Sequence, residues 1–173
     1  IPFFVYMPGL FEKFLQKLLE YTEMKIESQF NTIPWEKDGK EEKEMKPDLV
    51  IYENRLRDND KKPIRENIKF IADAKYMEDI GEKERYQIAF YLNELGIKNG
   101  FTISPTEEST LSDNNDGNIE YQDDESYTLD VPYQGIAIHV RHVNVDEFLE
   151  LAFSDKSIDE KAKVVKKIIS YQK

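Results

Sequence analysis

The chain of 173 residues contains no cysteine, only two histidines and no apolar run that approaches the roughly 20 residues of a membrane-spanning helix. The absence of cysteine excludes disulfides, thiolate zinc sites and iron–sulfur clusters, and it fits a reducing compartment. We therefore expect a cytoplasmic protein without a membrane segment. The two histidines, His139 and His142, are three apart in a strand-like pattern, so they should face opposite sides and not share a metal.

Basic residues are missing from one long acidic stretch. Residues 105–131 carry nine Asp and Glu residues and no Lys or Arg, within a chain whose net charge is −11. Removing those nine leaves 26 acidic residues against 24 basic ones, so the remainder of the chain is nearly balanced. The net charge therefore argues only weakly against an attraction to nucleic acid. We interpret 105–134 as an acidic insertion in a single domain that covers 1–173.

The chain starts at Ile1, and its first residues, "IPFFVY", are apolar but short and lack a basic leader. We do not interpret them as a signal peptide. We expect the chain to be a fragment of a longer protein.

Hydrophobic periodicity predicts the main elements. An amphipathic pattern predicts a helix over 8–24, and "WEKDGKEEKEMK" reads as a loop or edge turn around Asp38-Gly39. Two short apolar strands, 47–53 and 68–76, should pair as an antiparallel hairpin. The next elements are a helix over 82–95, with Gly96 as its C-terminal cap, and a strand over 99–105.

The second half of the chain should add a strand and two helices. We expect a turn at Asp116-Gly117, short strands near 119–122 and 127–131, and a clear strand over 135–143. One helix should follow from Asn144 to Phe153, and another should start where Ser157 and Glu160 have capping-box spacing. This order predicts an α/β fold, with a mixed central sheet flanked by helices in three layers.

Six residues stand out as a candidate site: Glu12, Asp48, Asp73, Lys75, Gln87 and Tyr91. Asp48 opens one strand of the predicted hairpin, and Asp73 and Lys75 end the other, so antiparallel pairing can bring them together. Two carboxylates there are ligands suited to Mg²⁺ or Mn²⁺. Lys75 could orient or deprotonate an attacking water, or stabilise developing charge as a fixed cation. Gln87 and Tyr91, four apart, share one helix face, and Glu12 could add an acidic contact.

A simpler interpretation of Asp73 and Lys75 is a surface ion pair worth about 0–1 kcal/mol. With 35 acidic and 24 basic residues, an acid-x-base triplet is expected roughly five times by chance. The context of the triplet argues for a site, because it ends an apolar strand and Pro-Asp opens another strand upstream.

The stretches "PDLVIYE" and "FIADAKY" together resemble the motif of the PD-(D/E)xK nucleases. "LFEKFLQKLL" upstream and "ERYQIAFYLNELG" downstream resemble the nuclease domain of McrC, the endonuclease subunit of the McrBC modification-dependent restriction systems. The resemblance covers about 7–105 and is weaker beyond Pro105.

This resemblance implies a restriction-endonuclease-like fold and a Mg²⁺-dependent DNA endonuclease, in which Mn²⁺ substitutes and the cut leaves a 5′-phosphate. It implies that Asp48, Asp73 and the carbonyl of Ala74 bind the metal and that Lys75 is catalytic. Glu12 and Gln87 would support the active site, with Tyr91 as the second member of the helix motif. It also implies a GTP-hydrolysing AAA+ partner of the McrB type, bound through a segment N-terminal to the nuclease domain.

Two other functions remain open from the sequence. The same fold can serve as a catalytically silent module that binds DNA or a partner. It can also be a repair or recombination nuclease that acts on free DNA ends.

Overall fold

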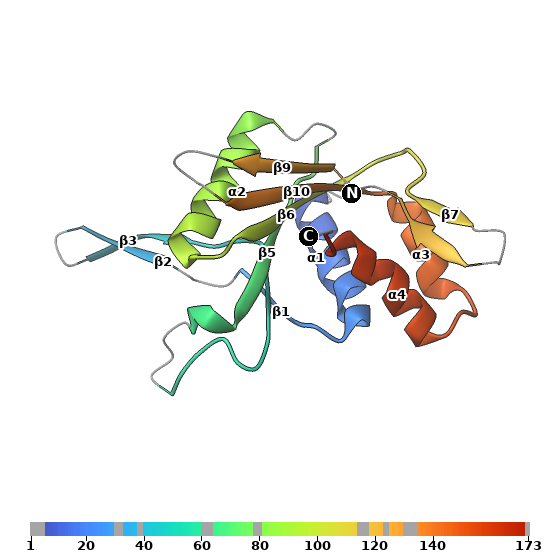
Figure 1. Ribbon diagram of the computed structural model, residues 1–173, viewed down its shortest axis with the longest axis horizontal. Helices are drawn as coiled ribbons and strands as arrows, with labels where there is room; N and C mark the ends of the chain where they lie inside the picture. Colours follow the sequence, from blue (N-terminus) through green and yellow to red (C-terminus); the bar gives the residue numbers. More distant parts are fainter. Residues whose placement is uncertain are drawn as a thin grey trace, which may run out of the picture.

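The fold centres on a six-stranded mixed sheet (Figure 1). The computed structural model describes residues 6–29, 33–37, 40–59, 64–77, 81–113, 118–122, 125–129 and 135–171. The strand order is β1-β4-β5-β6-β10-β9, in which β5, β6 and β10 are parallel and the other pairs are antiparallel. The strands are β1 (Lys25–Ser28), β4 (Leu49–Tyr52), β5 (Ile68–Ala74), β6 (Asn99–Pro105), β9 (Glu125–Leu129) and β10 (Ile136–Val143).

Helices cover both faces of this sheet, as the sequence predicts. The helix α2 (Glu82–Leu95) packs on one face, where Ile88, Ala89 and Leu92 meet side chains of β4, β5 and β10. The other face is covered by α1 (Met7–Leu19), α3 (Val145–Phe153) and α4 (Ile158–Ile168), which share a second apolar core around Phe101 and Ile103. The chain is therefore an α/β protein with a mixed sheet between helices.

The connection from β5 through α2 to β6 positions one helix closely over the sheet. Gly100 of β6 lies beneath α2, and a Cβ at this position would be 2.9 Å from Leu92 Cδ1. The absence of a side chain therefore lets the helix approach the strands. At its end, α2 is capped by Gly96 with a φ of 69°, in the left-handed region that favours glycine.

Most predicted elements are present, with adjusted bounds. The antiparallel pairing of β4 with β5 is confirmed, and so is the capping box that joins Ser157 and Glu160 at the start of α4. The helix expected over 8–24 ends at Leu19 and continues as a short 3-10 helix, η1 (Glu20–Thr22). A second 3-10 helix, η2 (Arg65–Asn67), precedes β5.

The two small sheets differ most from expectation. Of the loop or edge turn expected over 35–46, the loop is wrong, because β2 (Ile33–Lys37) pairs with β3 (Lys40–Met45) in an antiparallel ribbon that extends from the rest of the chain (Figure 1). β1 has no counterpart among the elements predicted from the sequence. The acidic stretch 105–134 supplies β7 (Leu111–Asp113) and β8 (Ile119–Tyr121), which pair with each other, as well as β9 at the edge of the central sheet. The turns expected at Asp38-Gly39 and Asp116-Gly117 lie outside the described residues.

Within the described ranges, no helix combines the length and the apolar character that crossing a bilayer would need.

Candidate functional site

The register of three neighbouring strands aligns the central residues of the site. Leu49 of β4 pairs with Ala72 of β5, so continuing the register by one residue places Asp48 opposite Asp73. Leu49 also pairs with Ser28 of β1, and the next residue, Gln29, donates its backbone N–H to Asp48 O at 3.0 Å. Because side chains opposite one another share a face of the sheet, this row brings residues distant in the sequence to one place.

Asp48 and Asp73 form a close pair of carboxylates. Asp73 is 2% exposed, and Asp48 is partly buried and accepts a hydrogen bond from the backbone N–H of Ala74 at 2.8 Å. Burial and the neighbouring charge of Asp73 raise the pKa of Asp48 to about 8. The hydrogen bond from Ala74 acts in the opposite direction but does not outweigh them. Two acids so close together resist being ionised at the same time.

Lys75 provides the positive charge of the site. Its Nζ forms an ion pair with Asp73 Oδ2 and donates a hydrogen bond to Gln87 Oε1 at 3.0 Å. Burial alone would lower the pKa of Lys75, but the carboxylates of Asp73 and Asp48 outweigh burial and raise it. Lys75 is therefore a fixed cation at neutral pH, which favours charge stabilisation over proton abstraction among its possible roles.

The helix α2 holds Lys75 from above the sheet. Gln87 and Tyr91 lie one turn apart, and Gln87 Nε2 donates a hydrogen bond to Tyr91 Oη at 2.9 Å. This bond orients the amide so that its oxygen faces the Lys75 ammonium. Tyr91 is 9% exposed and packs into the core beneath α2, so the helix anchors the amide firmly.

Glu12 reaches the site from α1 through a residue that the sequence analysis missed. Gln29 Nε2 donates to Glu12 Oε1 at 3.0 Å and lies 3.3 Å from Asp48 Oδ1. Gln29 has a φ of 53°, in the left-handed region that is uncommon for residues other than glycine. Backbone strain of this kind often occurs at functional sites.

All six predicted side chains therefore belong to one continuous set of contacts. It runs from Glu12 through Gln29, Asp48, Asp73, Lys75 and Gln87 to Tyr91. Their chemical roles remain predictions. Thr102 of β6, opposite Asp73 in register, is a further missed neighbour, fully buried with a hydroxyl that has no hydrogen-bond partner among the described residues.

His139 packs among aromatic rings of the core. The His139 ring lies between the rings of Phe101 and Tyr171, with centroid distances of 4.9 and 4.7 Å, and its Nε2 is 3.2 Å from Asn99 Oδ1. This environment indicates a packing role for His139.

The oxygen atoms at the carboxylate pair suit a hard divalent cation. Among the described residues, no three His, Cys, Asp or Glu side chains are grouped as a metal site. Mg²⁺ is nevertheless commonly held by one or two carboxylates together with water and substrate phosphate. Ala74 directs its N–H toward Asp48, and in a strand the carbonyl of the same residue points to the same side. Asp48, Asp73 and the Ala74 carbonyl therefore fit a Mg²⁺ or Mn²⁺ ion, which would also offset the repulsion within the pair.

Comparisons of the chain with models of known protein families, with curated proteins and with solved structures gave no match. The function is therefore argued from the motifs in the sequence and from the geometry of the site.

Proposed function

We propose that the chain is a Mg²⁺-dependent DNA endonuclease domain of the PD-(D/E)xK class, with a restriction-endonuclease-like fold and a resemblance to McrC. The observation that carries the proposal is the convergence of Asp48, Asp73 and Lys75 at one end of the β4–β5 pair. Two acids and one amine at this point match the chemical requirements of phosphodiester hydrolysis.

In this proposal, Asp48, Asp73 and the Ala74 carbonyl hold the cation. When bound, Mg²⁺ would polarise a phosphate oxygen and lower the pKa of a water molecule. Asp48 must be ionised to act as a ligand. Because the raised pKa of Asp48 means that its carboxyl group is protonated at neutral pH, binding of the cation would release this proton.

Lys75 contributes a preorganised positive charge next to the reacting phosphate. Its ammonium is held by Asp73 and Gln87, so little reorganisation is needed as negative charge develops in the transition state. Gln87 and Tyr91 orient this ammonium from α2, while Glu12 and Gln29 orient Asp48 from the opposite side. We expect the products to carry a 5′-phosphate.

The proposal also includes a GTP-hydrolysing AAA+ partner of the McrB type and a place in a modification-dependent restriction system. It is supported by the resemblance of 7–105 to McrC. If this is right, cleavage of modified DNA by the full assembly should require GTP as well as Mg²⁺.

The first test measures cation binding, which does not depend on a partner. Mn²⁺ bound to the 173-residue chain should reduce the electron paramagnetic resonance signal of the free ion, and Asp73→Asn should abolish this loss. Asp155→Asn removes an exposed acid outside the site and serves as the matched control. If the wild type and Asp73→Asn bind Mn²⁺ equally, the assigned metal site is wrong, and a catalytically silent module becomes the better interpretation.

The second test measures cleavage of a closed circular plasmid, alone and with the AAA+ subunit. An endonuclease nicks or linearises a circle, whereas a nuclease that requires free ends does not. Asp48→Asn, Asp73→Asn and Lys75→Met should each reduce cleavage by at least about 100-fold, as expected when a group that stabilises the transition state is lost. Cleavage that survives in any of the three variants would contradict the role assigned to that residue.

A further inference from the structure

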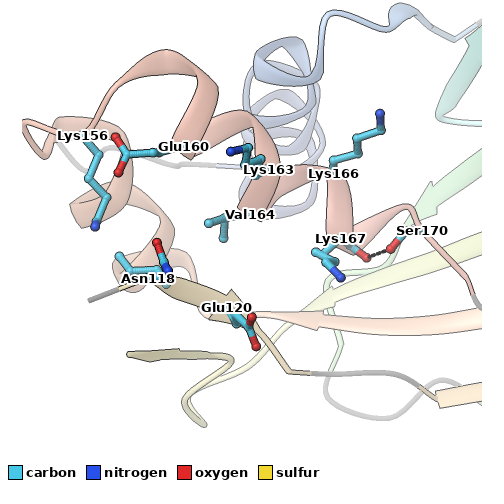
Figure 2. A pocket seen from close by; sticks show the side chains of 10 residues that line it. Asn118, Glu120, Lys156, Glu160, Lys163, Val164, Lys166, Lys167 and Ser170 are labelled. Carbon is cyan, nitrogen blue, oxygen red and sulfur yellow. Dashed lines mark hydrogen bonds between the residues drawn. The ribbon is translucent and has the colours of Figure 1, made fainter. Parts of the chain in front are cut away.

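A groove lined by lysines lies between α4 and β8 (Figure 2). Its volume is about 550 Å³, with α4 and the turn before it on one wall and Asn118, Ile119 and Glu120 on the other. Lys156, Lys163, Lys166 and Lys167 belong to its lining. In Figure 2, Lys156 and Lys167 extend on the side of β8, whereas Lys166 extends away from β8.

The lysines of α4 form a row along the helix. Lys163 is three and four residues before Lys166 and Lys167, so these side chains are neighbours on the helix surface. All three are exposed and make no ion pair or side-chain hydrogen bond among the described residues. By contrast, Lys161 donates to Ala152 O and Ser154 O, both at 2.8 Å. The lysines of the row therefore have charges that are available to a ligand.

Two acidic residues also line the groove. Glu160 is held by the capping box, where its carboxylate accepts from Ser157 N at 2.9 Å and from Ser157 Oγ at 2.7 Å. These hydrogen bonds, and after them the nearby charges of Lys156 and Lys163, lower the pKa of Glu160. Glu120 is exposed on the opposite wall and forms no ion pair within the part of the chain that the structure describes. Four lysines against two glutamates leave a positive groove on a chain whose net charge is −11.

The two walls of the groove belong to elements that follow the carboxyl ends of two neighbouring strands of the central sheet. The strands β5, β6 and β10 are parallel, so their carboxyl ends lie along one edge. The end of β5 carries Asp73, the end of β6 leads to the β7–β8 hairpin, and the end of β10 leads to α3 and α4. Ligands of open α/β sheets commonly bind along this edge.

We infer that the row of lysines on α4 binds the sugar–phosphate backbone of a DNA duplex along the exposed face of α4, beside the groove. Lysine binds phosphate as a point charge without base specificity, and a duplex presents one negative charge per roughly 1.7 Å of its axis. The contacts would position the substrate without reading its sequence. This inference rests on the proposed function, since DNA is the substrate assigned to the site.

The experiment measures binding without cleavage. Fluorescence anisotropy of a labelled duplex, in EDTA and over a series of NaCl concentrations, gives both the Kd and its dependence on salt. Three phosphate contacts contribute about 2–3 units to the slope of log K against log salt, so K163Q/K166Q/K167Q should lower the slope by that amount. At moderate salt, we expect the Kd to rise at least about tenfold.

Matched variants separate this site from a general charge effect. K17Q/K25Q/K69Q removes three exposed lysines that do not line the groove and should change the slope much less. K163R/K166R/K167R keeps the charges and should bind as the wild type does. Glu120→Gln removes a negative charge from the facing wall and should tighten binding a few-fold.

The possible outcomes distinguish the inference from the proposed function. If the wild type cuts DNA but both triple glutamine variants have the same slope, the inference is wrong and the function stands. If lysine-dependent binding occurs without Asp73-dependent cleavage, the inference stands and the function is wrong. The triple glutamine substitution of the row could instead leave the salt dependence of DNA binding unchanged and abolish binding to an acidic protein. That result would assign Lys163, Lys166 and Lys167 to a protein partner and overturn the inference.

Discussion

Asp48 and Asp73 are two carboxyl groups that the fold holds close together. Their backbones are opposite each other in antiparallel strands, so the carboxylates cannot separate without a shift in register. Lys75 forms an ion pair with Asp73, while Asp48 accepts hydrogen bonds from the Ala74 N–H and the Gln29 amide and shares one with Asp73. The raised pKa of Asp48 therefore keeps a proton on this pair at neutral pH.

This arrangement predicts how stability changes with pH in EDTA. The pKa of Asp48 is raised from 3.8 to about 8, so the folded chain binds a proton that the unfolded chain has released. The contribution of Asp48 is present below pH 3.8 and is lost as the pH rises toward 8. Asp48→Asn removes this loss, and at pH 8 its Tm should exceed that of the wild type by at least about 2–4 °C.

Thermal unfolding followed by circular dichroism across this pH range checks the prediction. Asp155→Asn should give a curve parallel to that of the wild type, because Asp155 is exposed and lies outside the site. If the curve of Tm against pH for Asp48→Asn is also parallel to that of the wild type, Asp48 is ionised in the folded chain and the prediction is wrong.

At the residue scale, motif spacing predicts the six candidate site residues but not the neighbouring residues that contact and orient them. Gln29 has no motif of its own, because its role comes from an unusual φ and from pairing of β1 with β4. Thr102 lies opposite Asp73 only because β6 is parallel to β5, which the sequence does not specify. Contacts across strands from distant parts of the chain have no local signal.

At the scale of elements, hydrogen bonds to Glu147 of α3 hold the start of the β7–β8 hairpin against this helix. The Glu147 carboxylate accepts hydrogen bonds from Ser109 Oγ, Thr110 N, Thr110 Oγ1 and Leu111 N, at 2.5 to 3.2 Å. Asn144 caps the same helix and donates to the carbonyls of Glu107 and Glu108. These contacts fix one wall of the lysine-lined groove relative to the helical layer.

Glu147→Gln should loosen this attachment. Burial by itself would raise the pKa of Glu147, but the hydrogen bonds outweigh it and lower the pKa. The stabilisation is therefore present above the ordinary pKa of a glutamate and is lost as the pH falls through the lowered value. We expect Glu147→Gln to lower the free energy of unfolding by about 1–2 kcal/mol, because an amide offers one acceptor oxygen and no charge.

Hydrogen exchange read by mass spectrometry is the most direct measurement of this effect. Amides of 107–113 and 118–122 should exchange faster in Glu147→Gln, and in the wild type they should also lose protection at acidic pH. Glu150→Gln changes an exposed acid of the same helix and should leave the hairpin protected. Equal protection in both variants would contradict the attachment.

The elements that the sequence predicts are those with an apolar face, and the missed ones lie at edges. The sequence predicts β5 and β6 because both strands are buried on both faces and are therefore apolar, with Ile71 and Phe101 fully buried. By contrast, β1, β3 and β7 are "KIES", "KEEKEM" and "LSD", short and largely polar sequences. Edge strands often carry charged side chains, which protect them from pairing with other chains. Hydrophobic periodicity therefore cannot distinguish them from loops.

At the scale of the whole molecule, the charge is divided between two regions that meet at α4. The stretch 105–131 is acidic throughout, while Lys163, Lys166 and Lys167 lie on the helix that contacts β8. A net charge of −11 therefore does not describe the surface that a polyanion would meet.

The carboxylate pair also predicts that a divalent cation stabilises the whole fold. A ligand that binds only the folded chain adds about 2.7 kcal/mol at 100 times its Kd. For a chain of this length, this corresponds to a rise in Tm of roughly 5–11 °C. Differential scanning calorimetry with Mg²⁺ or Mn²⁺ at constant ionic strength should show this rise in the wild type and little of it in Asp73→Asn. An equal rise in both would place the cation elsewhere.

The row formed by Gln29, Asp48 and Asp73 has one more consequence, which concerns the synthesis of the chain. No short peptide contains the row, since its members come from strands spread over the first half of the sequence. A chain still emerging from the ribosome therefore lacks the row until β1, β4 and β5 have all been made and have paired.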